Sequence, residues 1–340
     1  NININMEFQN IILDLLYSPV CEVITNKNFI SYLTKNINFL YGVKGQDLTF
    51  PAPQPASIEK KNFYKLKQYE YYTSLKLDGV RFLMYFLKDK NKNNKCIIVN
   101  RALNFFNISI CAEDSLYSGT LFDGEIIYDK LNKKWDFTIH DALIICGNKI
   151  DKLSHSERLN DTSCCVESFI TDMDYSTLNI TVKQFYPFCD FNNFIENVYN
   201  KSSNNDGIIF MPQKLPVISG TQYSMFKWKP ENKHTFDFLL KENDVGLEAY
   251  VFHMVKLQLF AKIHEEIKEG KEFIEKVKKL KNYKNECIVE CLFEKDKNNF
   301  IPILVRTDKT HPNSMRTIER TLFNIGENIQ INDFKNILND

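Results

Sequence analysis

One lysine carries the chemistry that the sequence suggests first, in the stretch Lys76–Arg81, which reads KLDGVR. Lys76 follows an apolar, aromatic run, and Arg81 places a second cation nearby. Partial desolvation and neighbouring positive charge both lower the pKa of an amine and so make it a nucleophile. Asp78 can accept a hydrogen bond or orient a metal, and Gly79 lets backbone approach a ligand closely. Taken alone, the pattern also fits a surface strand that leads into a turn.

Five further stretches with charged side chains beside apolar runs follow in a fixed order: Thr120–Ile127, Asp141–Ile145, Asp206–Phe210, Lys227–Pro230 and Arg306–Asn313. Lys227 and Lys229 lie two apart, so a strand would direct both to one face and Trp228 to the other. Carboxylates beside apolar strands, such as Glu125 and Asp206, suit hard divalent cations that also bind phosphate. Simpler alternatives are a solvent-facing strand for the lysines and a β-turn at Asp206-Gly207.

This ordered series resembles the covalent nucleotidyltransferase superfamily, which comprises mRNA capping guanylyltransferases and ATP-dependent DNA ligases. Lys227-Trp228-Lys229-Pro230, followed by Thr235–Leu240, is more similar to the capping form of the fifth motif. Pro51–Ser57 and Ile288–Cys291 resemble the capping enzymes as well. The resemblance runs from about Phe50 to the C-terminus. The six motifs in order are specific, whereas no single motif is.

The resemblance implies a two-step transfer of GMP. Lys76 would attack the α-phosphate of GTP, with Mg²⁺ or Mn²⁺ held by Glu125 and Asp206. Lys227 and Lys229 would hold the α-phosphate and depress the pKa of Lys76. The 5′-diphosphate end of an RNA would then accept GMP to form a GpppN cap. GTP and an RNA 5′ end are therefore the implied partners, alongside an RNA triphosphatase, a cap methyltransferase or RNA polymerase.

A wider set of nucleotide contacts follows from the same resemblance. Arg101 is similar to the family's ribose-binding arginine, and Lys183 to a lysine that helps to select guanine. Residues of the second domain would close over the β- and γ-phosphates. The expected nucleotide-binding residues are Arg81, Arg101, Glu125, His140, Lys183, Asp206, Lys227, Lys229, Asp237, Arg306, Asp308 and Lys309.

Two positions depart from the family pattern. His140 stands where the family has an aromatic residue, often Phe; its imidazole can stack on a purine, and a core histidine is an equal alternative. Leu304 replaces an arginine two residues before Arg306, so one phosphate contact is lost or is supplied elsewhere, for instance by Arg316. The alternative functions are an ATP-dependent polynucleotide ligase and a degenerate relative that only binds RNA.

Composition limits the class of protein. The 340 residues suffice for two domains, and 44% hydrophobic and 13% aromatic content predict a substantial core. Lysine plus arginine and aspartate plus glutamate number 43 each, so a polyanion would need a local basic groove. Nine cysteines without a CxxC pair indicate a reducing compartment. No apolar run reaches membrane-spanning length, so no membrane association is predicted.

The elements that must position these residues predict an α+β fold. We expect a nucleotidyltransferase domain with ATP-grasp-like antiparallel sheets, followed by an OB-fold barrel, because short strands around one helix suit a small Greek-key barrel. Strands are expected over 71–75, 80–87, 96–100, 105–108, 121–128, 135–145 and 247–260, and a charged helix over 263–281. The expected domains are an N-terminal helical, peripheral extension (1–50), the nucleotidyltransferase domain (51–234), the OB-fold (235–312) and a helical segment (313–340) that packs back on the nucleotidyltransferase domain.

The source and compartment are constrained only by composition and by the resemblance. Abundant Asn, Lys and Ile suggest an AT-rich genome, such as that of a large DNA virus or a protist. A cellular capping enzyme would be nuclear, whereas a viral one would be in the cytoplasm or the virion. The chain begins with Asn1, so we expect a processed or excised piece of a longer protein.

Overall fold

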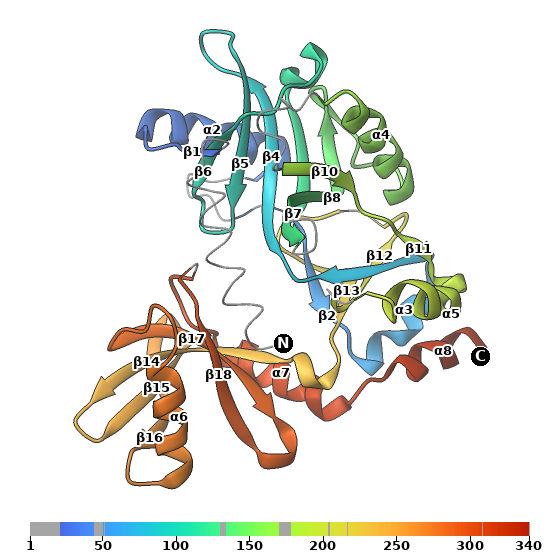
Figure 1. The fold of residues 1–340 in the computed structure, drawn as a ribbon. Helices are drawn as coiled ribbons and strands as arrows, with labels where there is room; N and C mark the ends of the chain where they lie inside the picture. Colours follow the sequence, from blue (N-terminus) through green and yellow to red (C-terminus); the bar gives the residue numbers. More distant parts are fainter. Residues whose placement is uncertain are drawn as a thin grey trace. The chain divides into compact units, whose positions relative to one another are not determined.

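The chain divides into two compact units, which Figure 1 shows as ribbons. The computed structural model describes residues 21–43, 50, 52–129, 134–169, 178–202, 205–215, 217–307 and 309–339. The N-terminal unit comprises the described residues up to Trp228 and those from Asn332 onward, and the C-terminal unit comprises Lys229–Ile331. The division therefore falls at residue 228 rather than at the expected residue 234.

Sheet I of the N-terminal unit has eight strands in the order β1-β6-β5-β4-β7-β8-β10, with β9 paired to β8. Only the β8–β10 pair is parallel among the pairs of this sheet that the structure describes. The strands are β1 Cys21–Val23, β4 Val80–Lys88, β5 Asn94–Asn100, β6 Phe105–Ile108, β7 Thr120–Asp129, β8 Lys134–Ile145, β9 Asn148–Lys149 and β10 Leu178–Val182. The strands predicted between residues 80 and 145 are confirmed.

Sheet II has five strands in the order β11-β3-β12-β13-β2. They are β2 Gln54–Ser57, β3 Tyr71–Leu77, β11 Tyr186–Pro187, β12 Asn205–Pro212 and β13 Thr221–Trp228. Ser74, Ile209 and Lys227 form one row across the sheet, so their side chains share a face. Lys76 lies two residues beyond Ser74 on β3 and belongs to that same face. We call this the lysine face of sheet II.

Helix α2 belongs to the core of the N-terminal unit, contrary to the expectation of a peripheral extension. It begins after the N-cap Asn26, which accepts hydrogen bonds from two backbone amides, and ends at Gly42 with a φ of 69°. Leu33 and Ile37 are at most 1% exposed and pack with residues of β4, β5 and β7. The apolar pattern at Ile11–Leu16 lies outside the described residues.

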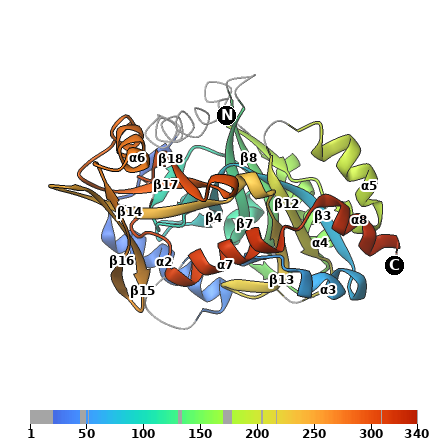
Figure 2. The same cartoon turned by 90° about the horizontal axis from the view of Figure 1, so that it is seen from below.

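Five helices of the N-terminal unit are described in full: α2 Lys27–Tyr41, α3 Phe63–Gln68, α4 His155–Glu167, α5 Phe191–Phe194 and α8 Ile331–Asn339. Figure 2 shows α8 beside α3. Phe334 of α8 is fully buried, and its ring contacts those of Phe63, Phe191, Phe210 and Trp228. Among the helices that the structure describes, none is long and apolar enough to cross a membrane.

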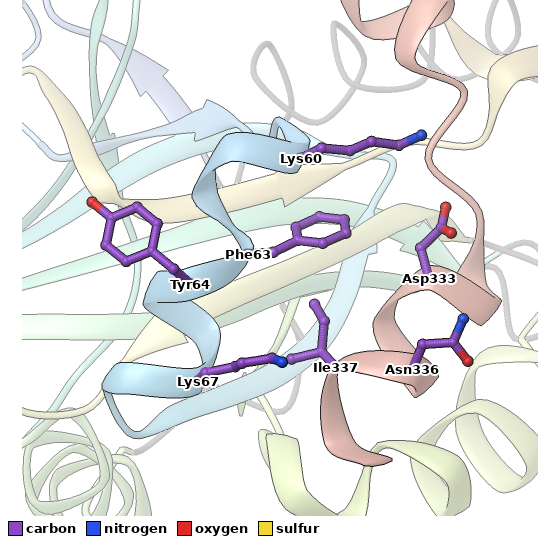
Figure 3. Close-up of a pocket in the computed structure, with 7 residues that line it drawn as sticks. All are labelled: Lys60, Phe63, Tyr64, Lys67, Asp333, Asn336 and Ile337. Carbon is purple, nitrogen blue, oxygen red and sulfur yellow. The ribbon is translucent and has the colours of Figure 1, made fainter. Parts of the chain in front are cut away.

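A pocket of about 490 Å³ opens between α3 and α8 (Figure 3). Phe210 and Trp228, on which α8 packs, alternate along their strands with Ile209 and Lys227. Helix α8 therefore covers the face of sheet II opposite to the lysine face. This pocket is consequently separate from the chemistry that the sequence predicts.

Sheet III of the C-terminal unit has five strands in the order β16-β15-β14-β17-β18. Its elements are β14 Thr235–Asn243, β15 Gly246–His253, β16 Lys256–His264, α6 Lys268–Lys278, β17 Glu286–Glu294, β18 Asn299–Val305 and α7 Met315–Glu327. Phe260 and Phe300 lie on the two edge strands, yet their ring centroids are 6.4 Å apart, so the sheet is curled. A curled five-stranded sheet with a helix, α6, between β16 and β17, the third and fourth strands along the chain, fits the expected OB-fold.

Three expectations for the C-terminal unit are wrong in detail. The expected strand over 247–260 is two strands, joined at Met254 and Val255 with φ angles of 45° and 69°. These residue types rarely adopt positive φ, so the sequence carries no turn signal there. The helix expected from residue 263 begins at Lys268 because β16 continues to His264. The 313–340 segment is divided: α7 buries Ile318 against sheet III, and only α8 joins the N-terminal unit.

Replacement of Phe334 by alanine should destabilise the N-terminal unit by about 3–5 kcal/mol, because the side chain fills a cluster of aromatic rings. Both tryptophans, Trp135 and Trp228, lie in that unit, so tryptophan fluorescence during urea unfolding reports on it. Phe39→Ala is the matched control, since Phe39 is 81% exposed on α2. An unchanged urea midpoint for Phe334→Ala would contradict the packing described.

Candidate active site

A β-bulge brings Lys76 and Asp206 together. Leu75 pairs with Ile208 and Leu77 with Asn205, so Asp206 and Gly207 both lie opposite Lys76. Gly207 has a φ of 133°, a conformation that side chains disfavour. The bulge directs the Asp206 carboxylate at the amine, and Lys76 Nζ donates to Asp206 Oδ2 at 2.5 Å. The Asp206-Gly207 pair is therefore a bulge inside a strand rather than the β-turn considered from the sequence.

Gly79 brings Glu125 of β7 next to the Lys76 turn. A Cβ atom at Gly79 would lie 2.6 Å from Glu125 Cγ and 2.6 Å from the Ile126 carbonyl oxygen. Only glycine therefore permits this approach of the turn to sheet I. The sequence predicts close approach of Gly79 to a ligand, whereas the structure places the Glu125 side chain there.

The carboxylates determine the protonation state of Lys76. Burial alone would lower the pKa of Lys76, but the charges of Asp206 and Glu125, with the hydrogen bond to Asp206, raise it above its ordinary value. The expectation of a depressed pKa is thus wrong for the protein without ligands. Its side chain is 22% exposed, so the amine is accessible yet held as an ammonium ion.

Arg81 contacts Asp123 with both arms of its guanidinium group. Nε donates to Asp123 Oδ1 at 2.8 Å, and the second nitrogen donates to Oδ2. The guanidinium also lies over the Phe50 ring, with its carbon 5.6 Å from the centroid. Burial and the charge of Asp123 raise the pKa of Tyr41, which ends α2 beside this pair. Arg81 is thus held by protein groups within the site.

His140 is the extra residue of a second bulge. Asp123 pairs with Asp141 and Gly124 with Ile139, which leaves His140 without a partner in the ladder between β7 and β8. Its Nε2 lies 3.4 Å from Asp123 Oδ1. Burial, with the cations of Arg81 and Lys183, holds the pKa of His140 well below its ordinary value, so the ring is neutral. A neutral, mostly buried imidazole among charged groups fits a base contact better than an ion pair.

Lys183 is a second amine of this site, and its pKa is shifted in the opposite direction to that of Lys76. Burial lowers its pKa to about 8; Glu125 opposes this change, and Lys76 and Arg81 reinforce it. Its backbone amide donates to the Ile139 carbonyl oxygen at 2.8 Å, which fixes the segment after β10 beside the His140 bulge. The structure thus brings Lys183 into the cluster that the sequence predicts.

Three other predicted cations lie at or just beyond the ends of strands. Lys227 is on the lysine face of sheet II near the end of β13, but the strand ends at Trp228, so Lys229 is not a second residue on that strand. Pro230 follows, and the residue before a proline is sterically restricted and the proline lacks an amide proton. Arg101 lies in the exposed turn after β5, where Asn100 pairs with Phe82, and so stands at the same end of sheet I as Arg81.

In the C-terminal unit, the side chain of Asp237 contacts two of the predicted phosphate-binding residues, Arg306 and Lys309. Its side chain is 7% exposed and contacts Arg306 at 3.4 Å and Lys309. Asn313 donates to the same carboxylate at 3.2 Å, and Arg306 also contacts Glu290 at 3.1 Å. Asp237, expected among the nucleotide-binding residues, is therefore a buried acceptor that holds the two cations. Asp308 lies outside the described residues.

The Leu304 departure has a structural explanation. Leu304 is 2% exposed on β18, where it pairs with Glu290, so it is a buried residue on the face of sheet III that also carries Glu290. Arg316, considered as a substitute for the missing arginine, lies exposed at the start of α7.

The site suits a metal only in part. Among the described residues, no group of three or more His, Cys, Asp or Glu side chains could hold a metal ion. Glu125 and Asp206 nevertheless act on the same amine, and their oxygens are ligands that Mg²⁺ and Mn²⁺ prefer. Two carboxylates fit a cation that is shared with substrate phosphates rather than one enclosed by protein.

Three residues of this site are not predicted from the sequence: Tyr41, His155 and Arg158. His155 and Arg158 begin α4, where a Ser154–Glu157 capping box is the only readable signal. Arg158 is 2% exposed and contacts Asp141 through two bonds of 2.8 Å. Nothing in the spacing of these residues marks them as neighbours of His140.

The combined geometry suits covalent transfer of a phosphoryl group. An accessible amine contacts a carboxylate that can take its proton, with a second carboxylate beside it. Lys183 and Arg81 are close enough to affect one another's charge, and Lys227 shares the lysine face with the amine. Phosphoryl transfer requires mainly such positioning and neutralisation of charge.

Comparison with known families is consistent across the chain. A family model described as the mRNA capping enzyme catalytic domain matches residues 20–231. A second, described as the mRNA capping enzyme C-terminal domain, matches residues 222–334.

Curated relatives include fungal and animal proteins. The "mRNA-capping enzyme subunit alpha" of Schizosaccharomyces pombe is 27% identical over 327 residues, which cover 84% of this chain and 79% of that protein. The "mRNA-capping enzyme" of Danio rerio is 27% identical over 289 residues, which cover 79% of this chain but 46% of that protein. Among solved structures, a mycobacterial DNA ligase D complexed with ATP and MES is similar with a TM-score of 0.40 and 12% identity, covering 77% of this chain and 97% of that one.

Asp206→Asn should lower the pKa of Lys76. Burial lowers this pKa, and the variant removes the negative charge of Asp206 that raises it. Acylation of Lys76 by an amine-reactive reagent, quantified by mass spectrometry across a series of buffers, should begin at lower pH than in the unmodified protein. Asp114→Asn is the control, since Asp114 contacts Lys88 on the surface. A shift of the Lys76 profile to higher pH would contradict the assigned ion pair.

Proposed function

The chain belongs to the mRNA capping enzyme family, and on that premise we propose that it is an mRNA guanylyltransferase with Lys76 as its nucleophile. The observation that carries this proposal is the contact between Lys76 and Asp206 on the lysine face, with Glu125 beside it. That arrangement matches a lysine that must exchange a proton before and after it carries a nucleotide.

The first step forms a phosphoramidate. Lys76 Nζ attacks the α-phosphorus of GTP, the bond from that phosphorus to the bridging oxygen breaks, and pyrophosphate leaves. The amine must first lose the proton that it donates to Asp206 Oδ2 at 2.5 Å in the protein without ligands. Lys227, Lys229 and Lys183 supply positive charge toward the phosphates and the base in this proposal.

Glu125 and Asp206 would hold the divalent metal, Mg²⁺ or Mn²⁺. When bound, the metal supplies positive charge that neutralises the phosphates and lowers the pKa of Lys76. The two carboxylates that keep Lys76 protonated in the absence of ligands would then be engaged by the metal. Metal binding would thereby prepare the amine for attack.

The remaining residues serve GTP recognition in this proposal. His140 contacts the guanine ring together with Lys183, and Arg101 contacts the ribose with Arg81 nearby. Arg306, Asp308 and Lys309 bind the β- and γ-phosphates, and Asp237 holds the two cations in place. The neutral state of His140 supports a base contact, because a neutral ring stacks without the cost of a buried charge.

The second step transfers GMP to RNA. A β-phosphate oxygen at the 5′-diphosphate end attacks the α-phosphorus, and the bond to Lys76 nitrogen breaks. The product is a GpppN end, and the amine regains its proton. Without a motif for reading bases, the protein would recognise the RNA end rather than a sequence, with salt-sensitive binding.

Partners and compartment follow from the relatives. The fungal relatives are named as α subunits, and we propose that this chain likewise acts with a separate RNA triphosphatase. A cap methyltransferase and RNA polymerase are further proposed partners. The relatives reported above come from cellular organisms, which favours a nuclear location over the viral alternative.

Incubation with a divalent metal and GTP radiolabelled at the α-phosphate should attach label covalently to Lys76. Lys76→Ala should abolish the label, whereas Lys65→Ala, on α3, should retain it. Denaturing electrophoresis measures the label, and mass spectrometry of the modified peptide locates it.

Other outcomes of this experiment are informative. Label from ATP but not from GTP would establish the polynucleotide ligase alternative. Binding of GTP or RNA without any covalent label, with metal present, would identify a degenerate relative. Label on a lysine other than Lys76 would refute the assignment of the nucleophile.

Glu125→Gln should raise the metal concentration needed for half-maximal labelling, because one of two carboxylates loses its charge. Chelation of divalent metal should abolish label in the unmodified protein. Titration with Mg²⁺ and Mn²⁺ measures both effects, and Glu196→Gln, on the surface, is the control. An identical metal dependence for Glu125→Gln would remove Glu125 from the metal site.

A further inference from the structure

The first turn of α4 contacts both sheets that carry the site. His155 Nε2 donates to the His140 carbonyl oxygen of sheet I at 3.0 Å. The His155 and Ser156 amides donate to the backbone and side-chain oxygens of Gln213, at 2.9 and 3.1 Å. Gln213 directly follows β12 of sheet II, the strand that carries Asp206. Figure 1 shows α4 beside β8 and β10.

The β8 bulge needs such support because the strand ladder does not hold it. His140 is the extra residue between two paired positions, so no cross-strand partner fixes its orientation. Its carbonyl group is held by His155, and the next residue, Asp141, is held by both arms of Arg158. These bonds therefore hold the backbone on both sides of the His140 Cα atom.

The first turn of α4 buries polar and charged groups that contribute little to the stability of the fold. The Arg158–Asp141 pair is almost fully buried, with side chains 2% and 3% exposed, and buried ion pairs lose much of their gain to desolvation. His155 Nδ1 and Gln213 Nε2 are buried with no hydrogen-bond partner among the residues that the structure describes. Apolar side chains of similar size would avoid these costs.

We propose that His155 and Arg158 are positioning residues for purine recognition: they hold the His140 bulge against Asp123 and so set the surface that meets the base. The proposal rests on the guanylyltransferase reaction proposed above, in which His140 contacts guanine. Neither residue touches the nucleotide, and each acts through His140 or Asp141. Such residues change nucleotide affinity and base preference more than the rate at saturation.

The decisive variant is His155→Phe. It removes the bond to His140 while a ring remains to meet Phe185, which lies edge-on at 4.5 Å. It also removes the unpaired Nδ1 atom, so the thermal midpoint should change little. The KM for GTP in the labelling reaction should rise about fivefold, with the maximal rate retained and the preference for GTP over ATP reduced.

Two further variants separate positioning from general stability. Arg158→Lys keeps the charge but not the forked geometry, so its KM should be intermediate between those of the unmodified protein and Arg158→Met. Ser163→Ala, further along the same helix, removes only a bond to the Leu159 carbonyl oxygen and should leave KM and base preference unchanged.

The outcomes distinguish the two proposals. Label formation by the unmodified protein, with an unchanged KM and base preference in His155→Phe, would overturn the positioning role. A lower thermal midpoint and rate at constant KM would overturn it equally, because that pattern indicates structure alone. If the unmodified protein forms no label, the guanylyltransferase proposal fails. The positioning role is then tested by measuring the affinity for GTP by calorimetry. Equal affinities of the unmodified protein and His155→Phe would refute positioning.

Discussion

The contact between Lys76 and Asp206 constrains the rest of the N-terminal unit. It requires β3 and β12 to be neighbours in sheet II, with one extra residue in β12 so that a carboxylate faces the amine. Beside this contact, Glu125 approaches from sheet I across Gly79. The resulting charge balance keeps the amine protonated until other charges arrive. Burial and carboxylate charge thus act on the Lys76 pKa in opposite directions, and the carboxylate charge prevails.

Two β-bulges interrupt strands that carry site residues. Asp206 with Gly207 interrupts β12, and His140 interrupts β8. A bulge turns a side chain out of the alternating pattern, so a residue that would face solvent or core can face a ligand instead. The β12 bulge is possible because Gly207 tolerates the required backbone angles. The β8 bulge at His140 is held by hydrogen bonds from α4. This division of roles explains why residues remote in sequence converge on one small volume.

Sequence patterns predict the strands of sheet I well, because alternation and glycine placement are local signals. The ordered motifs name Lys76, Glu125 and Asp206, which the structure brings close together, and Lys183, expected from its similarity to a family lysine, lies near them. Three features are not predictable in this way. The turn at Met254 and Val255 lacks turn residues, the role of α2 depends on contacts made 40 or more residues away, and the reversed pKa shift of Lys76 depends on a distance that a bulge sets. The last two arise from tertiary contacts that have no local signature.

Helix α8 has a consequence for how the protein is made. The ribosome completes this segment only after the whole C-terminal unit, yet Phe334 closes the aromatic cluster beneath β12 and β13. During synthesis, part of the apolar face of sheet II therefore stays uncovered while about a hundred further residues are added. At typical elongation rates this takes roughly 5–20 s. Nascent chains would need protection by chaperones over this interval, and the nucleophile-bearing unit would mature after the unit that follows it in the gene.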